Sequence, residues 1–209
     1  MPARGEPTVT LLLRHGQTPM SVQKRYAGRS DVPLTDLGVQ QAVGAAKRLA
    51  SAGLDVIVTS PLRRAVQTAD EVAAATGVPV VTDAGFRETD FGAWEGLTFS
   101  EVRERWPAEL NRWLADPAAA PPGGESLAEV SERVTAALHR VLSARELQTV
   151  VIVSHVTPIK TLVAAALLAP PPALYRMHLD VAALSRIDWY ADGPAVLRSF
   201  NDTGHLADE

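Results

Sequence analysis

The chain of 209 residues contains no cysteine. This absence excludes disulfide bonds, zinc sites built from thiolates, and catalysis by a cysteine nucleophile. It is compatible with a reducing compartment, and we expect a cytoplasmic protein. Any nucleophile or metal ligand must come from other residue types.

Long apolar runs and an excess of positive charge are also missing. The longest apolar candidate, residues 159–169, contains Lys160 and is too short to cross a membrane. The N-terminus lacks the apolar segment of a secretory signal, and we interpret residues 1–8 as a flexible lead-in or linker. The net charge is −4, so no global field attracts anions, and any anion site must be built locally.

The chain does contain enough apolar material for a sizeable core, because hydrophobic residues make up 46% and charged residues 21%. Three apolar runs predict strands that are buried on both faces, at residues 9–13, 54–60 and 148–155. The last two runs end in a polar residue and lead into a helix. We expect a single domain over residues 9–209.

Helix starts are also readable. Thr35 is typical of an N-cap that precedes an amphipathic helix. Ser60, which is followed by a proline, predicts the start of a second helix. Ser126 with Glu129 indicates a capping box, and residues 156–168 predict a buried helix.

Strands that alternate with helices predict an α/β fold, a three-layer α/β/α sandwich whose mostly parallel central sheet has helices on both faces. Residues 97–125 are interpreted as a small, cap-like helical insertion over the sheet edge. The tail after Leu179 alternates apolar and polar residues, which predicts antiparallel edge strands. Large aromatics near the insertion could stack on a ring, but the core is the favoured interpretation for Trp94, Phe99, Trp106 and Trp113.

Polar residues follow each of the three predicted strands. Arg14 and His15 follow the first, Arg63 and Arg64 lie one turn after the second, and His155 ends the third. Ligands of an open parallel sheet bind beyond the carboxyl ends of its strands. Histidines, arginines and helix N-termini that meet there make an anion site, and a phosphoryl group fits best because arginine matches its oxygens.

Structural roles are the alternative for each of these residues. A lone histidine at a strand end is more often structural than catalytic, and Arg63 and Arg64 could simply face solvent. His139, His178 and His205 have no comparable context and are expected to be structural. The joint placement at three strand ends is hard to explain by packing, and it favours function.

Several segments resemble one family in chain order, namely LLLRHGQT, DVPLTDLGVQQA, TSPLRRAVQTA, RETDFGAWEG and VVIVSH. The chain is similar over nearly its whole length to the histidine phosphatase superfamily, which has a phosphoglycerate mutase-like fold. The segments SHVTPIKTL, YRMHLD and NDTGHL resemble a narrower group. This narrower group comprises the C-terminal acid phosphatase domains of actinobacterial proteins that also carry a ribonuclease H domain, and these phosphatase domains are similar to alpha-ribazole phosphatase. A fused ribonuclease H domain in a longer parent protein is therefore expected as a partner.

The resemblance implies a phosphohistidine mechanism. His15 would attack the phosphorus atom as nucleophile, and Glu88 would be the general acid and later the base that activates water. Arg14, Arg64 and His155 would surround the phosphate oxygens and stabilise the charge of the transition state.

Four further residues are expected at the phosphate. Thr18 would donate a hydroxyl hydrogen bond, and Gly16 would let the backbone approach the phosphate closely. Ser21 stands where many family members have an asparagine, and Val156 stands where many have a glycine. We predict phosphate contacts for Ser21 and Val156, and both departures put those contacts in question.

The expected function is a metal-independent phosphomonoesterase that acts on small phosphorylated metabolites, with no cofactor. A phosphoglycerate mutase is the first alternative, and the short interval between Glu88 and His155 disfavours it. A non-catalytic phospho-ligand binding module is the second, and it is disfavoured because every catalytic position is filled. The physiological substrate stays open, and a monomer or a homodimer is expected.

Overall fold

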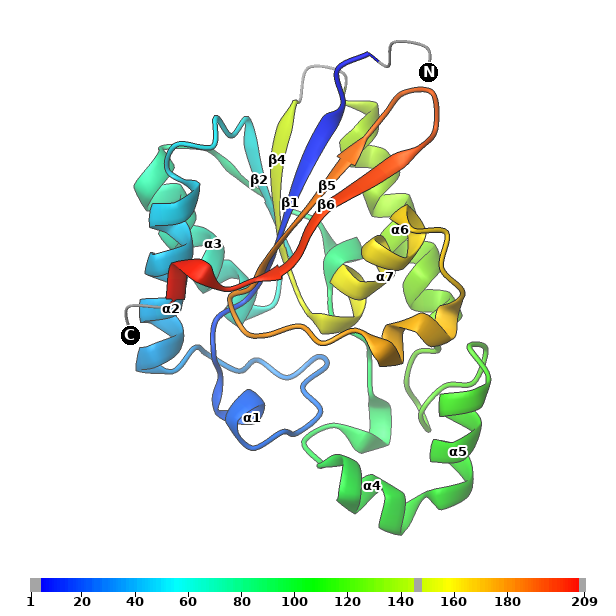
Figure 1. Ribbon diagram of the computed structural model, residues 1–209. Helices are drawn as coiled ribbons and strands as arrows, with labels where there is room; N and C mark the ends of the chain where they lie inside the picture. Colours follow the sequence, from blue (N-terminus) through cyan, green and yellow to red (C-terminus); the bar gives the residue numbers. More distant parts are fainter. Residues whose placement is uncertain (1–4, 145–147, 207–209) are drawn as a thin grey trace.

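The computed structural model describes residues 5–144 and 148–206, and its centre is a six-stranded mixed sheet (Figure 1). The sheet order is β3-β2-β4-β1-β5-β6. The strands are β1 (Thr8–Arg14), β2 (Val56–Thr59), β3 (Val80–Thr82), β4 (Thr149–Ser154), β5 (Leu184–Trp189) and β6 (Ala195–Asp202). The α-helices are α1 (Pro19–Val22), α2 (Asp36–Leu49), α3 (Arg63–Thr76), α4 (Phe99–Arg105), α5 (Pro107–Ala115), α6 (Leu127–Ser143) and α7 (Val156–Ala166).

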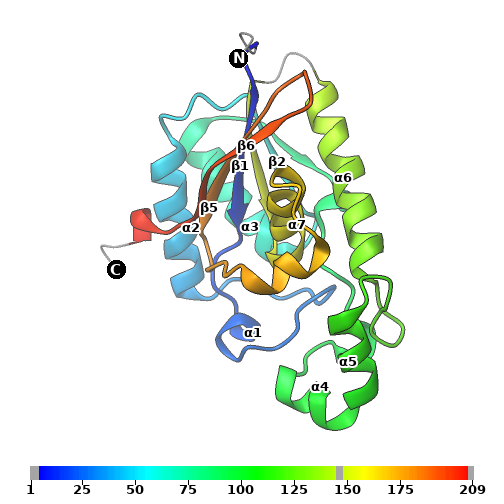
Figure 2. The ribbon, with the colours of Figure 1, turned by 45° about the vertical axis from the view of Figure 1, so that its right-hand side comes forward.

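Helices cover both faces of this sheet, which confirms the predicted three-layer α/β/α sandwich (Figure 2). Alternate residues of the buried strands point to opposite faces. Leu12 and Ile152 pack in the cluster with α6 and α7, whereas Leu13 and Val151 pack in the cluster with α2 and α3. The two apolar clusters hold β1, β2 and β4 in the middle of the molecule.

The strands that carry the polar junctions run in one direction. β1 and β2 both pair parallel with β4, and β2 pairs parallel with β3. The carboxyl ends of β1, β2 and β4 therefore lie at the same end of the sheet, next to α1 in Figure 1. The short, exposed β3 is missing from the sequence prediction, because three residues without a buried face give no apolar pattern.

The predicted helix starts are confirmed at three places and wrong at one, and α7 begins at Val156 as predicted. Thr35 caps α2 through the N–H of Gly38, and Ser126 caps α6 in a capping box. The second helix does not begin after Ser60, because α3 begins at Arg63. The Ser60 hydroxyl lies 2.7 Å from His155 Nε2, so this side chain belongs to the site described below.

The tail and the insertion complete the fold. β5 pairs antiparallel with β1, and β6 pairs antiparallel with β5, as predicted for the tail. α4 and α5 lie beyond the carboxyl ends of the parallel strands in both views (Figures 1 and 2). Residues 1–4 of the predicted lead-in lie outside the described residues, and residues 5–7 precede β1.

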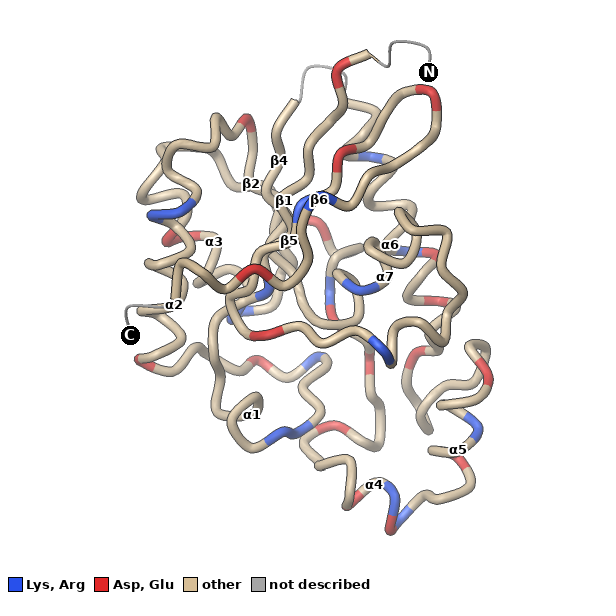
Figure 3. Tube along the Cα trace, viewed as in Figure 1, with Lys and Arg blue, Asp and Glu red and all other residues tan. Residues whose placement is uncertain are grey.

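The charge pattern does not mark a site on the scale of the whole fold. Figure 3 shows basic positions scattered among acidic ones along the chain. Within residues 5–144 and 148–206, none of the helices has the length and apolar character needed to span a bilayer. Because the basic positions are scattered, any anion site must arise from a few residues brought together locally.

Candidate active site

The two histidines predicted for the site lie side by side at the carboxyl ends of β1 and β4. Arg14 is paired with Ser154 in the parallel ladder, and the next residues along the two strands are His15 and His155. The centroids of the two imidazole rings are 5.1 Å apart. Strand pairing alone thus brings together two residues that are 140 positions apart in the sequence.

Arg64 joins this pair from the first turn of α3. It is buried, and its Nε donates a hydrogen bond to His155 Nδ1 at 3.2 Å. Because Nδ1 accepts this bond, the neutral His155 ring carries its proton on Nε2, which then donates to the Ser60 hydroxyl. The structure therefore gathers the residues of three strand ends, as the sequence analysis predicts.

A cavity of about 200 Å³ opens in front of these residues. Its lining includes Arg14 and His15 together with four other predicted residues, namely Thr18, Ser21, Glu88 and Val156. Arg64 and His155 lie behind His15 and are 1% and 0% exposed. The predicted phosphate contacts thus divide into a group that lines the cavity and a buried group that supports it.

The hydrogen bonds of Arg64 explain its supporting position. Nη2 donates to the carbonyl oxygens of Ala27 and Gly28 at 2.8 and 2.9 Å, and Nη1 donates to the carbonyl of Ser30 at 3.0 Å. With the bond to His155, four of the five guanidinium donors are already used. In this conformation Arg64 holds the 27–30 loop against the histidines and has one donor left.

Burial and positive charge keep both imidazoles neutral. The pKa of His15 is lowered well below its usual value, first by burial and then by Arg64 and Arg14. The pKa of His155 is lowered in the same way, with burial again the largest cause. His15 Nδ1 donates to the carbonyl oxygen of Gly16 at 2.7 Å, so its Nε2 carries the free lone pair. His15 is therefore an unprotonated nitrogen base at the cavity wall.

Arg14 supplies a cation to the cavity. Its Nη1 donates to the carbonyl of Leu179 at 2.6 Å, whereas its Nε is buried without a partner among the described residues. Burial lowers the pKa of Arg14 to about 10, so it stays protonated at neutral pH. A buried, unused N–H donor beside a neutral histidine suits an incoming anion.

Thr18 and Ser21 differ in what they can offer a ligand. The Thr18 hydroxyl oxygen accepts from the Ser21 N–H at 3.1 Å, and the Ser21 hydroxyl oxygen accepts from the Thr18 N–H at 2.9 Å. The Ser21 hydroxyl also donates to the Thr18 carbonyl at 2.8 Å. The Ser21 hydroxyl hydrogen is thus committed to the start of α1, which leaves Thr18 as the better donor to a phosphate.

Gly16 lies in a close contact between two backbone segments that the sequence does not reveal. A Cβ at Gly16 would lie 2.2 Å from the carbonyl oxygen of Gly38, and a Cβ at Gly38 would lie 2.1 Å from the carbonyl oxygen of Gln17. The Gly16 N–H donates to the Thr68 hydroxyl at 3.2 Å. A glycine is therefore required at position 16 because two backbone segments pack closely together there.

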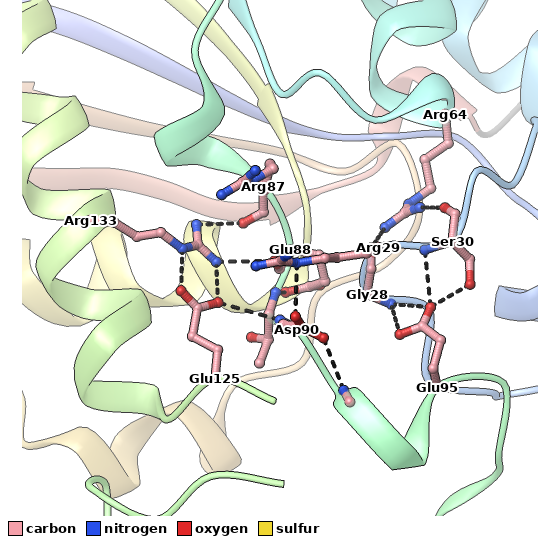
Figure 4. A network of polar contacts seen from close by, with 12 residues as sticks. Gly28, Arg29, Ser30, Arg64, Arg87, Glu88, Asp90, Glu95, Glu125 and Arg133 are labelled. Carbon is pink, nitrogen blue, oxygen red and sulfur yellow. Dashed lines mark hydrogen bonds and ion pairs between the residues drawn. The ribbon is translucent and has the colours of Figure 1, made fainter. Parts of the chain in front are cut away.

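Glu88 lines the cavity at the N-terminus of α7. Its Oε1 accepts from the N–H of Thr89 at 2.9 Å and from the N–H of Thr157 at 3.3 Å. The two carboxylates that resemble it in sequence position are used elsewhere. Asp90 forms an ion pair with Arg29, and Glu95 accepts hydrogen bonds from the N–H groups of Gly28 and Ser30 (Figure 4). Glu88 is thus the carboxylate of its segment that faces the candidate site.

Further residues line the cavity, and the sequence analysis does not single out Arg25, Tyr26 or Ala27 among them. The cavity is also lined by Arg25, Tyr26, Ala27, Phe91 and Thr157. Most of them lie in irregular segments, which have no hydrophobic period. Closeness in sequence to a predicted site residue is the signal that could have indicated them. Trp94 is fully buried, in agreement with the favoured core interpretation, whereas Phe99 is 44% exposed. Among the described residues, no group of three or more histidines and carboxylates could hold a metal ion.

Comparisons with known proteins agree with this geometry. The family model of the histidine phosphatase superfamily (branch 1) matches residues 10–203. The bifunctional protein Rv2228c of Mycobacterium tuberculosis is 50% identical over 205 residues, or 98% of this chain. The chain spans only 56% of that relative's length.

Two other similar proteins match along almost their whole length. A protein of Proteus mirabilis named probable phosphoglycerate mutase GpmB is 37% identical, and the match covers 94% of each chain. The solved structure of mycobacterial glucosyl-3-phosphoglycerate phosphatase Rv2419c with VO3 has a TM-score of 0.85 at 33% identity, and covers 96% of this chain and 100% of the other. One family model matches nearly all of the chain, and the alignments with these three proteins each cover more than nine-tenths of its length. The protein therefore belongs to the histidine phosphatase superfamily.

Proposed function

We propose that the protein is a phosphomonoesterase that hydrolyses small phosphorylated metabolites through a phosphohistidine at His15. The observation that carries this proposal is a buried, neutral imidazole that shares a cavity with Arg14 and Glu88. A nucleophile, a cation for the phosphate oxygens and a carboxylate are the groups that a two-step phosphoryl transfer needs.

In the first step, the lone pair of His15 Nε2 forms the N–P bond, and the bond between phosphorus and the leaving-group oxygen breaks. Glu88 gives its proton to that oxygen, so the product leaves as a neutral alcohol. Arg14 and Thr18 bind the phosphoryl oxygens, and the Val156 N–H at the N-terminus of α7 is a further donor. Arg64 and His155 lie behind His15 and do not line the cavity, and the charge of Arg64 helps to keep the His15 imidazole neutral.

In the second step, Glu88 takes a proton from a water molecule, and the water oxygen attacks the phosphorus atom of the phosphohistidine. The N–P bond breaks, the imidazole regains its lone pair, and inorganic phosphate is released. No step of this mechanism needs a metal ion. The lowered pKa of His15 keeps the nucleophile unprotonated below pH 6.5, which supports activity in the acid range.

A phosphoglycerate mutase is the second candidate function, because the relative from Proteus mirabilis has that name. The neighbour from mycobacteria is named a phosphatase, and the cavity of about 200 Å³ suits a small ester. The two functions differ in the acceptor of the phosphoryl group, which is water in one case and a bound sugar acid in the other. We favour hydrolysis.

The experiment uses 3-phosphoglycerate with a trace of the 2,3-bisphosphate, and it follows phosphate release and isomerisation together. The proposal predicts that phosphate release is the faster reaction. Isomerisation that outpaces phosphate release would assign the protein to the mutases. A phosphate-release screen over a panel of metabolites, with H15A as the blank, then identifies the substrate class.

We also propose that the chain corresponds to the phosphatase part of a longer two-function protein in the cytoplasm, with a ribonuclease H domain as the other part. The similar protein of Mycobacterium tuberculosis is named bifunctional, and this chain spans 56% of its length. A full-length parent protein that cleaves the RNA of RNA–DNA hybrids would support this proposal. A parent without that activity would refute it.

A further inference from the structure

A largely buried arginine on α6 binds the segment that carries Glu88 (Figure 4). Arg133 Nη1 donates to the carbonyl oxygens of Gly85 and Arg87 at 2.8 Å, and Nη2 donates to the carbonyl of Glu88 at 3.0 Å. Nε and Nη2 also donate to the two carboxylate oxygens of Glu125, at 2.6 and 2.8 Å. These contacts use all five donors of the guanidinium group.

Glu125 extends the same network to the other side of Glu88. Its Oε2 accepts from the Asp90 N–H at 3.3 Å, and its own N–H donates to the Asp90 carbonyl at 2.8 Å. Residues 87–91 belong to no helix or strand, so their backbone polar groups need partners outside regular structure. The Arg133–Glu125 pair therefore holds the backbone at Glu88 and again two residues later.

We propose that Arg133 and Glu125 are positioning residues for Glu88. They fix the orientation of the 87–90 backbone, and this orientation aims the Glu88 carboxylate at the cavity and at the leaving-group oxygen. The inference rests on the proposed role of Glu88 in proton transfer. Neither side chain lines the cavity, so both act through Glu88 rather than on the substrate.

A purely structural role is the alternative, and the same helix offers a matched control. Arg140 of α6 forms a similar two-pronged pair with Asp83, at 2.8 to 3.1 Å. Asp83 in turn accepts from the Gly85 N–H at 2.7 Å. This pair also fastens α6 to the segment before Glu88, but it does not contact Glu88 itself.

The test compares two substrates in each variant. p-Nitrophenolate leaves without a proton, whereas an alkoxide needs one, so a misplaced acid slows the transfer of the phosphoryl group to His15 for the alkyl phosphate only. The value of kcat/KM reports this first step and excludes the hydrolysis of the phosphohistidine, which both substrates share. We expect Arg133→Met and Glu125→Gln to lower the ratio of kcat/KM for the alkyl phosphate to kcat/KM for p-nitrophenyl phosphate by about tenfold or more. The ratio is measured within one preparation, so it does not depend on the folded fraction.

Glu88→Gln alone should lower the same ratio, and adding Arg133→Met to it should lower the ratio no further. Arg140→Met should leave the ratio at its original value. Equal losses for both substrates in Arg133→Met and Glu125→Gln would overturn the inference, as would a further fall in the double variant. An unchanged ratio in Glu88→Gln alone would instead refute the proposed role of Glu88, and the role of Arg133 with it.

Discussion

The ring centroids of His15 and His155 are 5.1 Å apart, and burial together with the charge of Arg64 lowers the pKa of both side chains. A neutral imidazole is the form that can attack phosphorus, so these surroundings suit the role that we propose for His15. The same surroundings have a cost for folding under acid conditions. In the unfolded chain each histidine takes up a proton near pH 6.5, whereas in the folded protein it stays neutral.

The first prediction concerns the stability of the fold between pH 6.5 and pH 5. As the pH falls through this window, the unfolded state binds protons that the folded state does not, so the free energy of unfolding decreases. Each histidine contributes a slope approaching about 1.4 kcal/mol per pH unit, and His15 and His155 together approach about 2.7. Urea denaturation at several pH values measures this slope.

Replacing one of the two buried histidines separates their contributions. His15→Gln should remove about half of the slope, because only the contribution of His155 then remains. A free energy of unfolding that does not change across this window would contradict the neutral state of the buried imidazoles.

At the scale of the elements, strand ends and helix starts deliver most of the site. The apolar runs predict β1, β2 and β4 because buried strands leave a clear pattern, and the parallel order brings Arg14, His15 and His155 together. The start of α3 is mispredicted because Ser60 resembles an N-cap, although its hydroxyl contacts His155. The loop residues of the cavity follow no period, so their positions depend on tertiary contacts that the sequence does not display.

The second prediction concerns the close contact between the loop after β1 and the start of α2. Gly16→Ala places a methyl group 2.2 Å from the Gly38 carbonyl oxygen, so one backbone segment must move. We expect the free energy of unfolding to fall by about 1–3 kcal/mol, and hydrolysis of p-nitrophenyl phosphate to fall with it because His15 is the adjacent residue. Gly5→Ala meets nothing within 4 Å and should change neither quantity. Wild-type stability in Gly16→Ala would show that this contact is not tight.

At the scale of the whole molecule, 24 acidic residues outnumber 20 basic ones, so the global field opposes an anionic substrate. The candidate anion site is local, because the carboxyl ends of the parallel strands collect Arg14, two buried histidines and the N-terminus of α7. The predicted fold class and family are confirmed. The roles of the site residues and the assembly state as monomer or homodimer stay predictions.

The third prediction follows from this local anion site. Inorganic phosphate at a hundred times its Kd should stabilise the fold by about 2.7 kcal/mol, which corresponds to a rise in Tm of about 5–10 °C for a chain of this size. Thermal unfolding with and without phosphate measures this shift. Arg14→Met should abolish it, whereas Arg63→Met, at an exposed position next to Arg64, should keep it. An equal rise in both variants would show that phosphate binds elsewhere.

The most direct measurement is the identification of the residue that carries the phosphoryl group during turnover. The protein is mixed with p-nitrophenyl phosphate, quenched in alkali within the first turnovers, digested, and analysed by peptide mass spectrometry. The account predicts a phosphoryl group on the His15 imidazole, and none in the H15A variant. A phosphoryl group on any other residue, or hydrolysis at the wild-type rate in H15A, would contradict it.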